Sequence, residues 1–266
     1  MPLSRGMRRV LTLWAGGALF LLYAPLVIVV LNSFNVSRTF AFPPSGLTLQ
    51  WWNAALHSSG AWNALASSVI VGLCATAIAL VLGTLAAFAL QRHRFFGRRA
   101  VNLLITLPIT LPGIVTGIAL AATFTSVLNV ALSVATIIVG HATFCIVVVF
   151  NNVQARLRRM GTALEDAAAD LGATGWQTMR LVTYPMIRGA LVAGALLAFA
   201  LSFDEIVVTT FTAGPDTTTL PLWIFSNLFR PNQAPVVNVV AAVLTVVAIV
   251  PVWLAQRLGG DIATTR

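Results

Sequence analysis

The chain has 266 residues, of which 58% are hydrophobic and only 9% are charged. A soluble domain carries about a quarter charged residues, so a protein that faces water on all sides is excluded. All sixteen basic residues are arginine and the net charge is +9, and without lysine the chain has no phosphate-binding loop of the G-x-x-x-x-G-K-[ST] type.

Six apolar runs follow one another along the chain, each near the length of about 20 residues that crosses a bilayer. They are residues 10–31, residues 64–90, a run from about 101, a run ending near 151, a run from about 189, and residues 235–254. A weak break near Asn129 divides the third run from the fourth. The pattern predicts an all-α, polytopic membrane protein with about six transmembrane helices, in one domain over residues 1–266.

The arginines predict how these spans are oriented. Fourteen lie in the loops on the N-terminal side of the membrane: Arg5, Arg8, Arg9, Arg92, Arg94, Arg98, Arg99, Arg156, Arg158, Arg159, Arg180, Arg188, Arg257 and Arg266. The opposite side holds Arg38 and Arg230. Loops rich in arginine stay in the cytoplasm, so both termini are predicted to be cytoplasmic. Arginines clustered beside apolar spans also explain the positive charge without a nucleic-acid partner.

The stretch 153–188 is amphipathic and lies on the cytoplasmic side in this topology. Thr162 and Glu165 have the spacing of a capping box, which predicts a helix from Ala163. Gly172 is placed to end that helix in a left-handed cap. A second box, Thr174 with Gln177, starts another helix, and Pro185 should end it near Tyr184, because a residue before proline is pushed out of the helical region.

The first of these two helices has a surface of small side chains, residues 167–169, which another protein can approach closely. On composition alone it could also be an ordinary amphipathic connector. Its spacing matches a known pattern, E-A-A-x3-G-x9-I-x-L-P, through Asp166-Ala167-Ala168, Gly172, Val182, Tyr184 and Pro185. Aspartate, valine and tyrosine replace glutamate, isoleucine and leucine, and each keeps the charge or the apolar character.

This pattern resembles the cytoplasmic loop of the permeases of ATP-driven (ABC) importers. Three further segments, residues 111–120, 201–206 and 212–222, are similar to spermidine/putrescine-type permeases, so the resemblance covers nearly the whole chain. It implies the six-helix core of a type I importer permease in a bacterial inner membrane. The residues implied in coupling to the ATPase are Glu165, Asp166, Ala167, Ala168, Gly172 and Pro185.

The resemblance also implies the partners. The permease would pair with a homologous permease and two ATPase subunits, which would bind the ATP and magnesium, and an external solute-binding protein would deliver the solute. The chain itself is expected to hold no cofactor, no metal and no catalytic site. ATP-driven closure of the ATPases would move the cytoplasmic helices and reorient the cavity by alternating access.

Asp204 and Glu205 are the carboxylates that fall within a predicted span. Acidic residues at membrane depth normally face a bundle interior or a water-filled cavity. Ser202, Glu205, Thr209 and Thr212 have the spacing of one helix face, which we expect to line the translocation path. Alternatively, the span ends before the two acids and leaves them in an external loop.

The third span offers a second polar face, with Pro108 and Pro112 able to free backbone carbonyls toward a cavity. Its members are Thr106, Thr110, Gly113 and Gly117. Small residues also serve simple helix packing, which is the alternative. Permeases of the spermidine/putrescine type often have an acidic residue where Gly113 stands. The solute is therefore expected to be polyamine-like or another small cationic amine, or else a different small solute, amino-acid-like or anionic.

The remaining chemistry-bearing residues fit structural roles. His141 lies alone in the fourth span, where hydrogen-bonded packing is favoured over a proton relay, and Cys74 and Cys145 have no partner at metal or redox spacing. The rival class is a stand-alone secondary transporter, which would need intramembrane ion sites in inverted repeats and has no reason to possess the 161–185 stretch. An intramembrane enzyme is a more distant alternative, because the chain has no His–Glu site and no pair of aspartates in the middle of a predicted span.

The arginine distribution generates a labelling prediction. In a background without Cys74 and Cys145, a membrane-impermeant thiol reagent added from outside should label Gly46→Cys and should not label Gly97→Cys. The reason is that residue 46 lies in the arginine-poor loop and residue 97 in the arginine-rich loop. The reverse labelling pattern would invert the whole topology.

Overall fold

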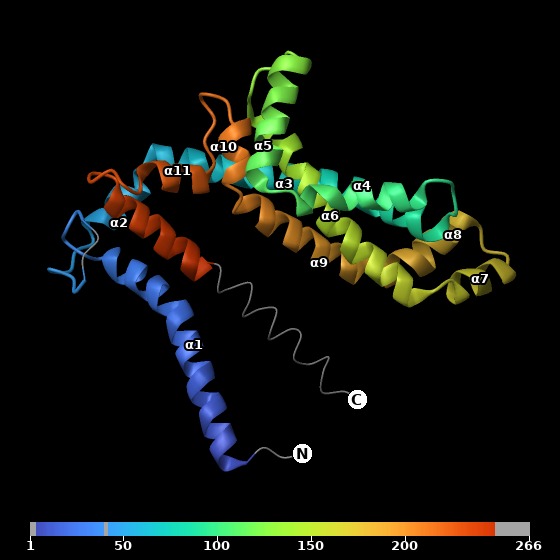
Figure 1. The fold of residues 1–266 in the computed structure, drawn as a ribbon, viewed down its shortest axis with the longest axis horizontal. Helices are drawn as coiled ribbons and strands as arrows, with labels where there is room; N and C mark the ends of the chain where they lie inside the picture. Colours follow the sequence, from blue (N-terminus) through green and yellow to red (C-terminus); the bar gives the residue numbers. More distant parts are fainter. Residues whose placement is uncertain (1–3, 40–41, 248–266) are drawn as a thin grey trace. The chain divides into compact units, whose positions relative to one another are not determined.

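The computed structural model describes residues 4–39 and 42–247, and its regular structure in these ranges is helical (Figure 1). The helices are α1 (Arg5–Asn32), α2 (Gln50–Leu56), α3 (Ser59–Arg92), α4 (Arg98–Thr110), α5 (Gly113–Ala122), η1 (Thr123–Val127), α6 (Val134–Met160), α7 (Ala163–Asp170), α8 (Gly175–Thr178), η2 (Met179–Thr183), α9 (Tyr184–Phe203), α10 (Val207–Thr212) and α11 (Leu220–Asn227). The two η segments are π-helical turns. A further helix covers Ala234–Val247. The predicted all-α class is confirmed.

Two compact units make up the chain, and each is described by itself. The larger unit is formed by residues 62–223, which include most of α3 and everything from α4 to α10. The smaller unit combines residues 1–61 with residues 224–266. The single domain predicted over residues 1–266 stays a prediction.

Four described helices are long and apolar enough to cross a membrane: Gly6–Asn32, Ser59–Arg92, Val134–Met160 and Gly175–Phe203. A fifth crossing would come from α4 and α5 together. The predicted span at residues 235–254 corresponds in part to the helix Ala234–Val247, and its other residues lie outside the described ranges. The count of six spans is therefore approximate. α6 also continues to Met160, beyond the end predicted near Asn151, whereas the break predicted at Asn129 is present.

The predicted third span is not a continuous helix. The axes of α4 and α5 differ by 105°, and α5 points away from α4 in Figure 1. Leu111 has an extended backbone (φ −78°, ψ 143°) and Pro112 caps α5, because a residue that precedes proline is pushed out of the helical region. The prediction of one helix face is therefore wrong for Thr106, Thr110, Gly113 and Gly117.

The helix that contains the predicted fifth span begins well before Gly189. α8, η2 and α9 form one helical run, Gly175–Phe203, of 29 residues, so the prediction that Pro185 ends a helix at Tyr184 is wrong. Pro185 lies in the first turn of α9, directly after the π-helical turn η2. Proline has no N–H to donate and crowds the preceding turn, and a wider π turn at that point lets the helix continue.

The core of the larger unit lies where α3, α6 and α9 pack together. Ala87 of α3, Phe150 of α6 and Ala198 of α9 are all fully buried in it. α6 and α9 lie side by side along their length (Figure 1). This three-helix packing fixes the two ends of α9, at which the candidate functional residues lie.

The smaller unit contains α1 and the loop that follows it. No side chain in the apolar window of α1 is buried, and an apolar helix of this length needs an apolar environment around it. In the loop, the side-chain oxygen of Asn35 accepts a hydrogen bond from the Ser45 backbone N–H at 3.2 Å. The Trp51 indole donates to the Asn35 carbonyl at 2.9 Å, and the ring of Trp52 stacks on that of Phe34. The tryptophan pair therefore orders this loop.

The close approach of α3 and α6 generates a stability prediction. In Gly83→Ala the new Cβ would lie 2.8 Å from the Ile146 carbonyl oxygen and 3.0 Å from the Phe150 amide nitrogen. Overpacking costs about 1–3 kcal/mol, which exceeds the gain of about 1 kcal/mol in helix propensity. The melting temperature of the purified complex should therefore fall.

Gly16→Ala in α1 is the matched control, because nothing lies within 4 Å of a Cβ at that position. Its melting temperature should equal or exceed that of the wild type. Equal melting temperatures for the two variants would show that α3 and α6 do not pack as described.

Candidate functional site

The loop after α6 contains one short helix, α7, which begins at the predicted Ala163. It ends in a Schellman motif: the Gly172 amide bonds to the Ala169 carbonyl at 2.9 Å, and the Ala173 amide bonds to the Ala168 carbonyl at 3.0 Å. Gly172 has a φ of +80°, a left-handed conformation that glycine adopts without strain. The predicted start of the helix and its left-handed cap are both confirmed.

Glu165 does not cap α7, so the predicted capping box of Thr162 and Glu165 is wrong. The Glu165 carboxylate instead forms an ion pair with Arg92 of α3, with 2.8 Å between Nη2 and Oε1, and accepts a 2.8 Å hydrogen bond from the Thr183 hydroxyl of η2. Arg92 also donates from Nη1 to the Gly161 carbonyl at 3.0 Å. These bonds, the Arg92–Glu165–Thr183 network, join the end of α3, α7 and η2.

The network is shielded from much of the solvent. The side chains of Arg92 and Glu165 are 15% and 18% exposed, so solvent screens their attraction less than it screens an exposed ion pair, which is worth about 0–1 kcal/mol. An arginine that reaches a carboxylate and a carbonyl at once is also held in one orientation. The predicted second capping box forms beside it, with Thr174 and Gln177 exchanging two hydrogen bonds at the start of α8.

The other side of α7 is exposed. Leu164 is 54% exposed and Leu171 is 90% exposed, with Asp166 and Ala167 exposed between them. Exposed apolar side chains that lie together are typical of a surface that a protein partner or the membrane covers. A cavity of about 470 Å³ lies between α3, α7 and η2. Of the other predicted coupling residues, Ala168 is half-buried on α7, and Pro185 lies on α9.

In the membrane part, the predicted fifth span is interrupted after Phe203. α10 begins at Val207, and the short break between the helices holds Asp204 and Glu205. Glu205 accepts a hydrogen bond from the Val208 backbone N–H at 2.9 Å, so its carboxylate caps the start of α10. The single continuous helix face predicted through Ser202, Glu205, Thr209 and Thr212 is therefore wrong.

His141 of α6 contacts both sides of this break. Its Nδ1 lies 2.8 Å from the Ser202 hydroxyl of α9, and its Nε2 lies 2.9 Å from the Thr209 hydroxyl of α10. Thr136 adds a 2.8 Å hydrogen bond to the Thr212 carbonyl. The hydrogen-bonded packing role predicted for His141 is confirmed. Ser202 and Thr209 are buried against α6, so in this conformation they do not line an open path.

The two carboxylates differ in their surroundings: Asp204 lies at the negative end of the α9 dipole, whereas Glu205 accepts from the start of α10. Asp204 is the exposed C-cap of α9, and Glu205 is half-buried. The C-terminus of a helix carries roughly half a negative charge, so an aspartate there is unfavourable unless a cation balances it. This end of α9 is therefore suited to attract positive charge.

The predicted residues of the third span divide between two places. The hydroxyls of Thr106 and Thr110 donate to carbonyls of their own helix, α4. Gly113 lies against α10, where an added Cβ would be 3.4 Å from Val207. This contact agrees with the alternative that the small residues of the third span serve helix packing. Sequence reasoning missed the role of Arg92, because no local spacing links it to Glu165, 73 positions away.

The sequence that forms these helices matches a known family. Residues 79–262 match the family model of the binding-protein-dependent transport system inner membrane component. The chain belongs to this family. It is a multi-pass membrane component of a binding-protein-dependent importer, as the resemblance implied.

Curated relatives cover nearly the whole chain. The putrescine transport system permease protein PotI of Escherichia coli (strain K12) is 35% identical over 92% of this chain and 88% of its own length. The spermidine/putrescine transport system permease protein PotC of the same strain is 33% identical over 90% of each chain.

Solved structures share the fold. A bacterial ABC transporter involved in the import of the acidic polysaccharide alginate has a chain that matches with a TM-score of 0.71 at 17% identity, over 98% of this chain and 99% of its own. The MetNI methionine ABC transporter matches with a TM-score of 0.56 at 21% identity, over 78% of this chain and 95% of its own. The predicted fold of an ABC importer permease is therefore confirmed.

The Arg92–Glu165 ion pair generates a double-mutant prediction. Arg92→Ala and Glu165→Ala should each lower ATP-driven transport and the melting temperature of the complex, since each leaves a shielded charge without its partner. The double variant should be little worse than either single variant, with a coupling energy of about 0.5–3 kcal/mol.

Arg94→Ala, which removes an exposed arginine of the same loop, is the control and should change neither quantity. Strictly additive losses in the double variant would show that the ion pair does not hold α7.

Proposed function

We propose that this permease component imports polyamine-like solutes or other small cationic amines. The observation that carries the proposal is the pair of carboxylates, Asp204 and Glu205, at the C-terminal end of a membrane helix that stops at Phe203. Asp204 is exposed and its carboxylate accepts none of the hydrogen bonds found within residues 4–39 and 42–247. It is therefore available to a passing cation.

The interrupted helix adds further ligands for a cation. The last four carbonyls of an α-helix have no donor within the helix. At the end of α9 the first of these four, the Ala200 carbonyl, accepts from the Asp204 backbone N–H at 3.2 Å. The carbonyls that follow it are the ones offered to a cation. Interrupted membrane helices use such ends to coordinate cations. An ammonium group carries three donors and can exchange its hydration for carboxylate and carbonyl oxygens. Two acids alone hold it weakly, which suits a path that must release its cargo.

The names of the relatives support an amine. Putrescine and spermidine are the solutes named for PotI and PotC. A putative 2-aminoethylphosphonate transport system permease protein, PhnV of Salmonella typhi, is 29% identical over 89% of this chain, and its named solute also carries an amine. A different small solute, amino-acid-like or anionic, is the second candidate, favoured by Gly113 where polyamine-type permeases often have an acid. A stand-alone secondary transporter would have no use for α7.

We further propose that the chain is a non-catalytic subunit that pairs with a homologous permease and two ATPase subunits. The exposed side of α7 would dock on an ATPase, and an external solute-binding protein would deliver the solute. Closure of the ATPases on ATP would move α7, and the Arg92–Glu165–Thr183 network would pass the movement to α3 and α9. The arginine distribution supports cytoplasmic positions for α7 and for both termini.

The carboxylates generate an uptake prediction. Asp204→Asn with Glu205→Gln should slow putrescine uptake at least about tenfold, because hydrogen bonds to charged groups are worth about 1.5–3 kcal/mol. Glutamine keeps an oxygen for the Val208 amide, so the start of α10 should survive. Uptake of labelled putrescine by assembled transporter in proteoliposomes measures the effect.

Asp216→Asn is the matched control, because it removes an exposed carboxylate from the loop after α10. Its uptake should be normal. Normal uptake by a correctly assembled Asp204/Glu205 double variant would remove these acids from the path and with them the case for a cationic solute.

The left-handed cap generates a coupling prediction. Gly172→Val should uncouple transport from ATP hydrolysis, because a β-branched residue at a φ of +80° is strained and the end of α7 would be displaced. Gly175→Val is the control, since Gly175 has no left-handed backbone and nothing lies within 4 Å of a Cβ there. Membrane insertion should persist in both variants. A Gly172→Val transporter with the normal ratio of uptake to ATP hydrolysis would remove α7 from the coupling path.

A further inference from the structure

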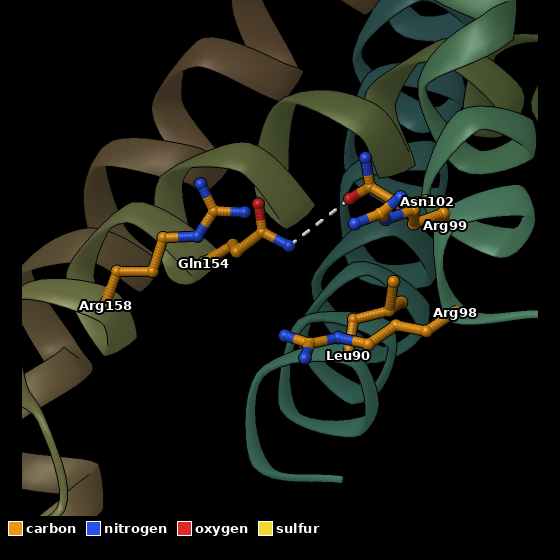
Figure 2. Close-up of a pocket in the computed structure, with 6 residues that line it drawn as sticks. All are labelled: Leu90, Arg98, Arg99, Asn102, Gln154 and Arg158. Atoms are coloured by element: carbon orange, nitrogen blue, oxygen red, sulfur yellow. Dashed lines mark hydrogen bonds between the residues drawn. The ribbon is translucent and has the colours of Figure 1, made fainter. Parts of the chain in front are cut away.

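Three arginines converge on a cavity that the transport cycle proposed above does not use. The cavity has a volume of about 340 Å³ and lies between the end of α3, the start of α4 and the last part of α6 (Figure 2). Its lining residues are Leu90, Arg98, Arg99, Asn102, Gln154 and Arg158. Figure 2 shows Gln154 and Arg158 of α6 on one side of the cavity and Asn102 and Arg99 of α4 on the other.

No acidic residue balances this charge in the described part of the chain. Arg98 and Arg99 are the first two residues of α4, and Arg158 lies in the last turn of α6. The ion pair found within the described ranges is that of Arg92 with Glu165, so none of the three cavity arginines has a carboxylate partner there. Three like charges around one cavity repel one another unless an anion lies between them.

The start of α4 adds to the positive potential. Gly97, its N-cap, has no side chain to accept from the first N–H groups, and the first turn contains no acidic residue. The positive end of the helix dipole is therefore unbalanced beside the arginines. Gln154, which is 8% exposed, forms the inner wall. Its amide nitrogen reaches the Asn102 side-chain oxygen at 3.5 Å, a long contact that uses one of its two hydrogens.

The surface next to the cavity is apolar. Leu103 and Leu104 of α4 are 62% and 66% exposed, one turn beyond the arginines, and Phe96 in the preceding loop is fully exposed. The cavity itself lies at the ends of membrane-length helices, the level at which phospholipid headgroups meet protein. A free inorganic anion makes no favourable contact with such an apolar surface, whereas the acyl chains of a lipid pack against it.

We propose that this cavity binds the phosphate of an anionic phospholipid, with the acyl chains lying along the exposed leucines of α4. The guanidinium groups of Arg98, Arg99 and Arg158 donate to the phosphate oxygens, for which the planar fork of arginine is well shaped. Basic cavities between membrane helices are suited to such headgroups. The transported amine is excluded from this cavity, because its charge has the same sign as the lining.

The test uses the complete transporter, this chain with its partner subunits, and measures bound lipid by native mass spectrometry. The wild-type complex should bind phosphatidylglycerol more tightly than zwitterionic phosphatidylcholine. Arg98→Gln with Arg99→Gln and Arg158→Gln should weaken phosphatidylglycerol binding at least about a hundredfold, since each charge-assisted hydrogen bond is worth roughly a tenfold change or more. Arg99→Gln alone should weaken it about tenfold and keeps the test informative if the triple variant does not assemble.

The control removes the same charge from exposed arginines that do not line the cavity, Arg94→Gln with Arg159→Gln and Arg180→Gln. Its phosphatidylglycerol affinity should stay close to that of the wild type. Each of these outcomes would overturn the proposal: equal loss of affinity in the control, equal binding of the two lipids, or a melting temperature of the complex that inorganic phosphate alone raises as far as phosphatidylglycerol does. Release of the ATPase subunits from the triple variant would assign the arginines to that interface instead.

Discussion

The ion pair between Arg92 and Glu165 determines where α7 lies. A helix of eight residues is too short to be stable by itself, and this one is held to the end of α3 and to η2 through one carboxylate. Because that carboxylate faces inward, the acidic and apolar side chains of α7 face outward. The exposed surface proposed for the ATPase therefore depends on a contact that the ATPase does not make.

The same contact connects the two functional regions of the larger unit. Thr183, which donates to Glu165, lies near the beginning of the helical run Gly175–Phe203, and Ser202, which contacts His141, lies at its end. A run of 29 residues is about 40 Å long, enough to cross the membrane. In the proposed cycle, one helix therefore connects α7 to the break that carries Asp204 and Glu205.

Local patterns in the sequence predicted the parts of this arrangement that depend on neighbouring residues. The spans, the start of α7 and the left-handed cap at Gly172 follow from apolar length, from capping residues and from the freedom of glycine. Contacts between distant residues cannot be predicted from local spacing. The spacing of Thr162 and Glu165 predicts a capping box, whereas in the structure Glu165 pairs with Arg92. The effect of each proline on its helix could not be predicted either. Pro112 interrupts its span, whereas the π turn before Pro185 lets that helix continue.

If the helical run Gly175–Phe203 carries the movement of α7, and the His141 bonds to Ser202 and Thr209 hold α10 to its end, α7 and α10 should keep a fixed separation during transport. The distance between spin labels at Asp170→Cys on α7 and Thr210→Cys on α10, both exposed positions, measures that separation in a chain without Cys74 and Cys145. In a transporter that is hydrolysing ATP and taking up solute, the distance distribution should be the same with and without ATP, and it should broaden in Glu165→Ala. A distance that changes with ATP in the otherwise intact chain would contradict the account.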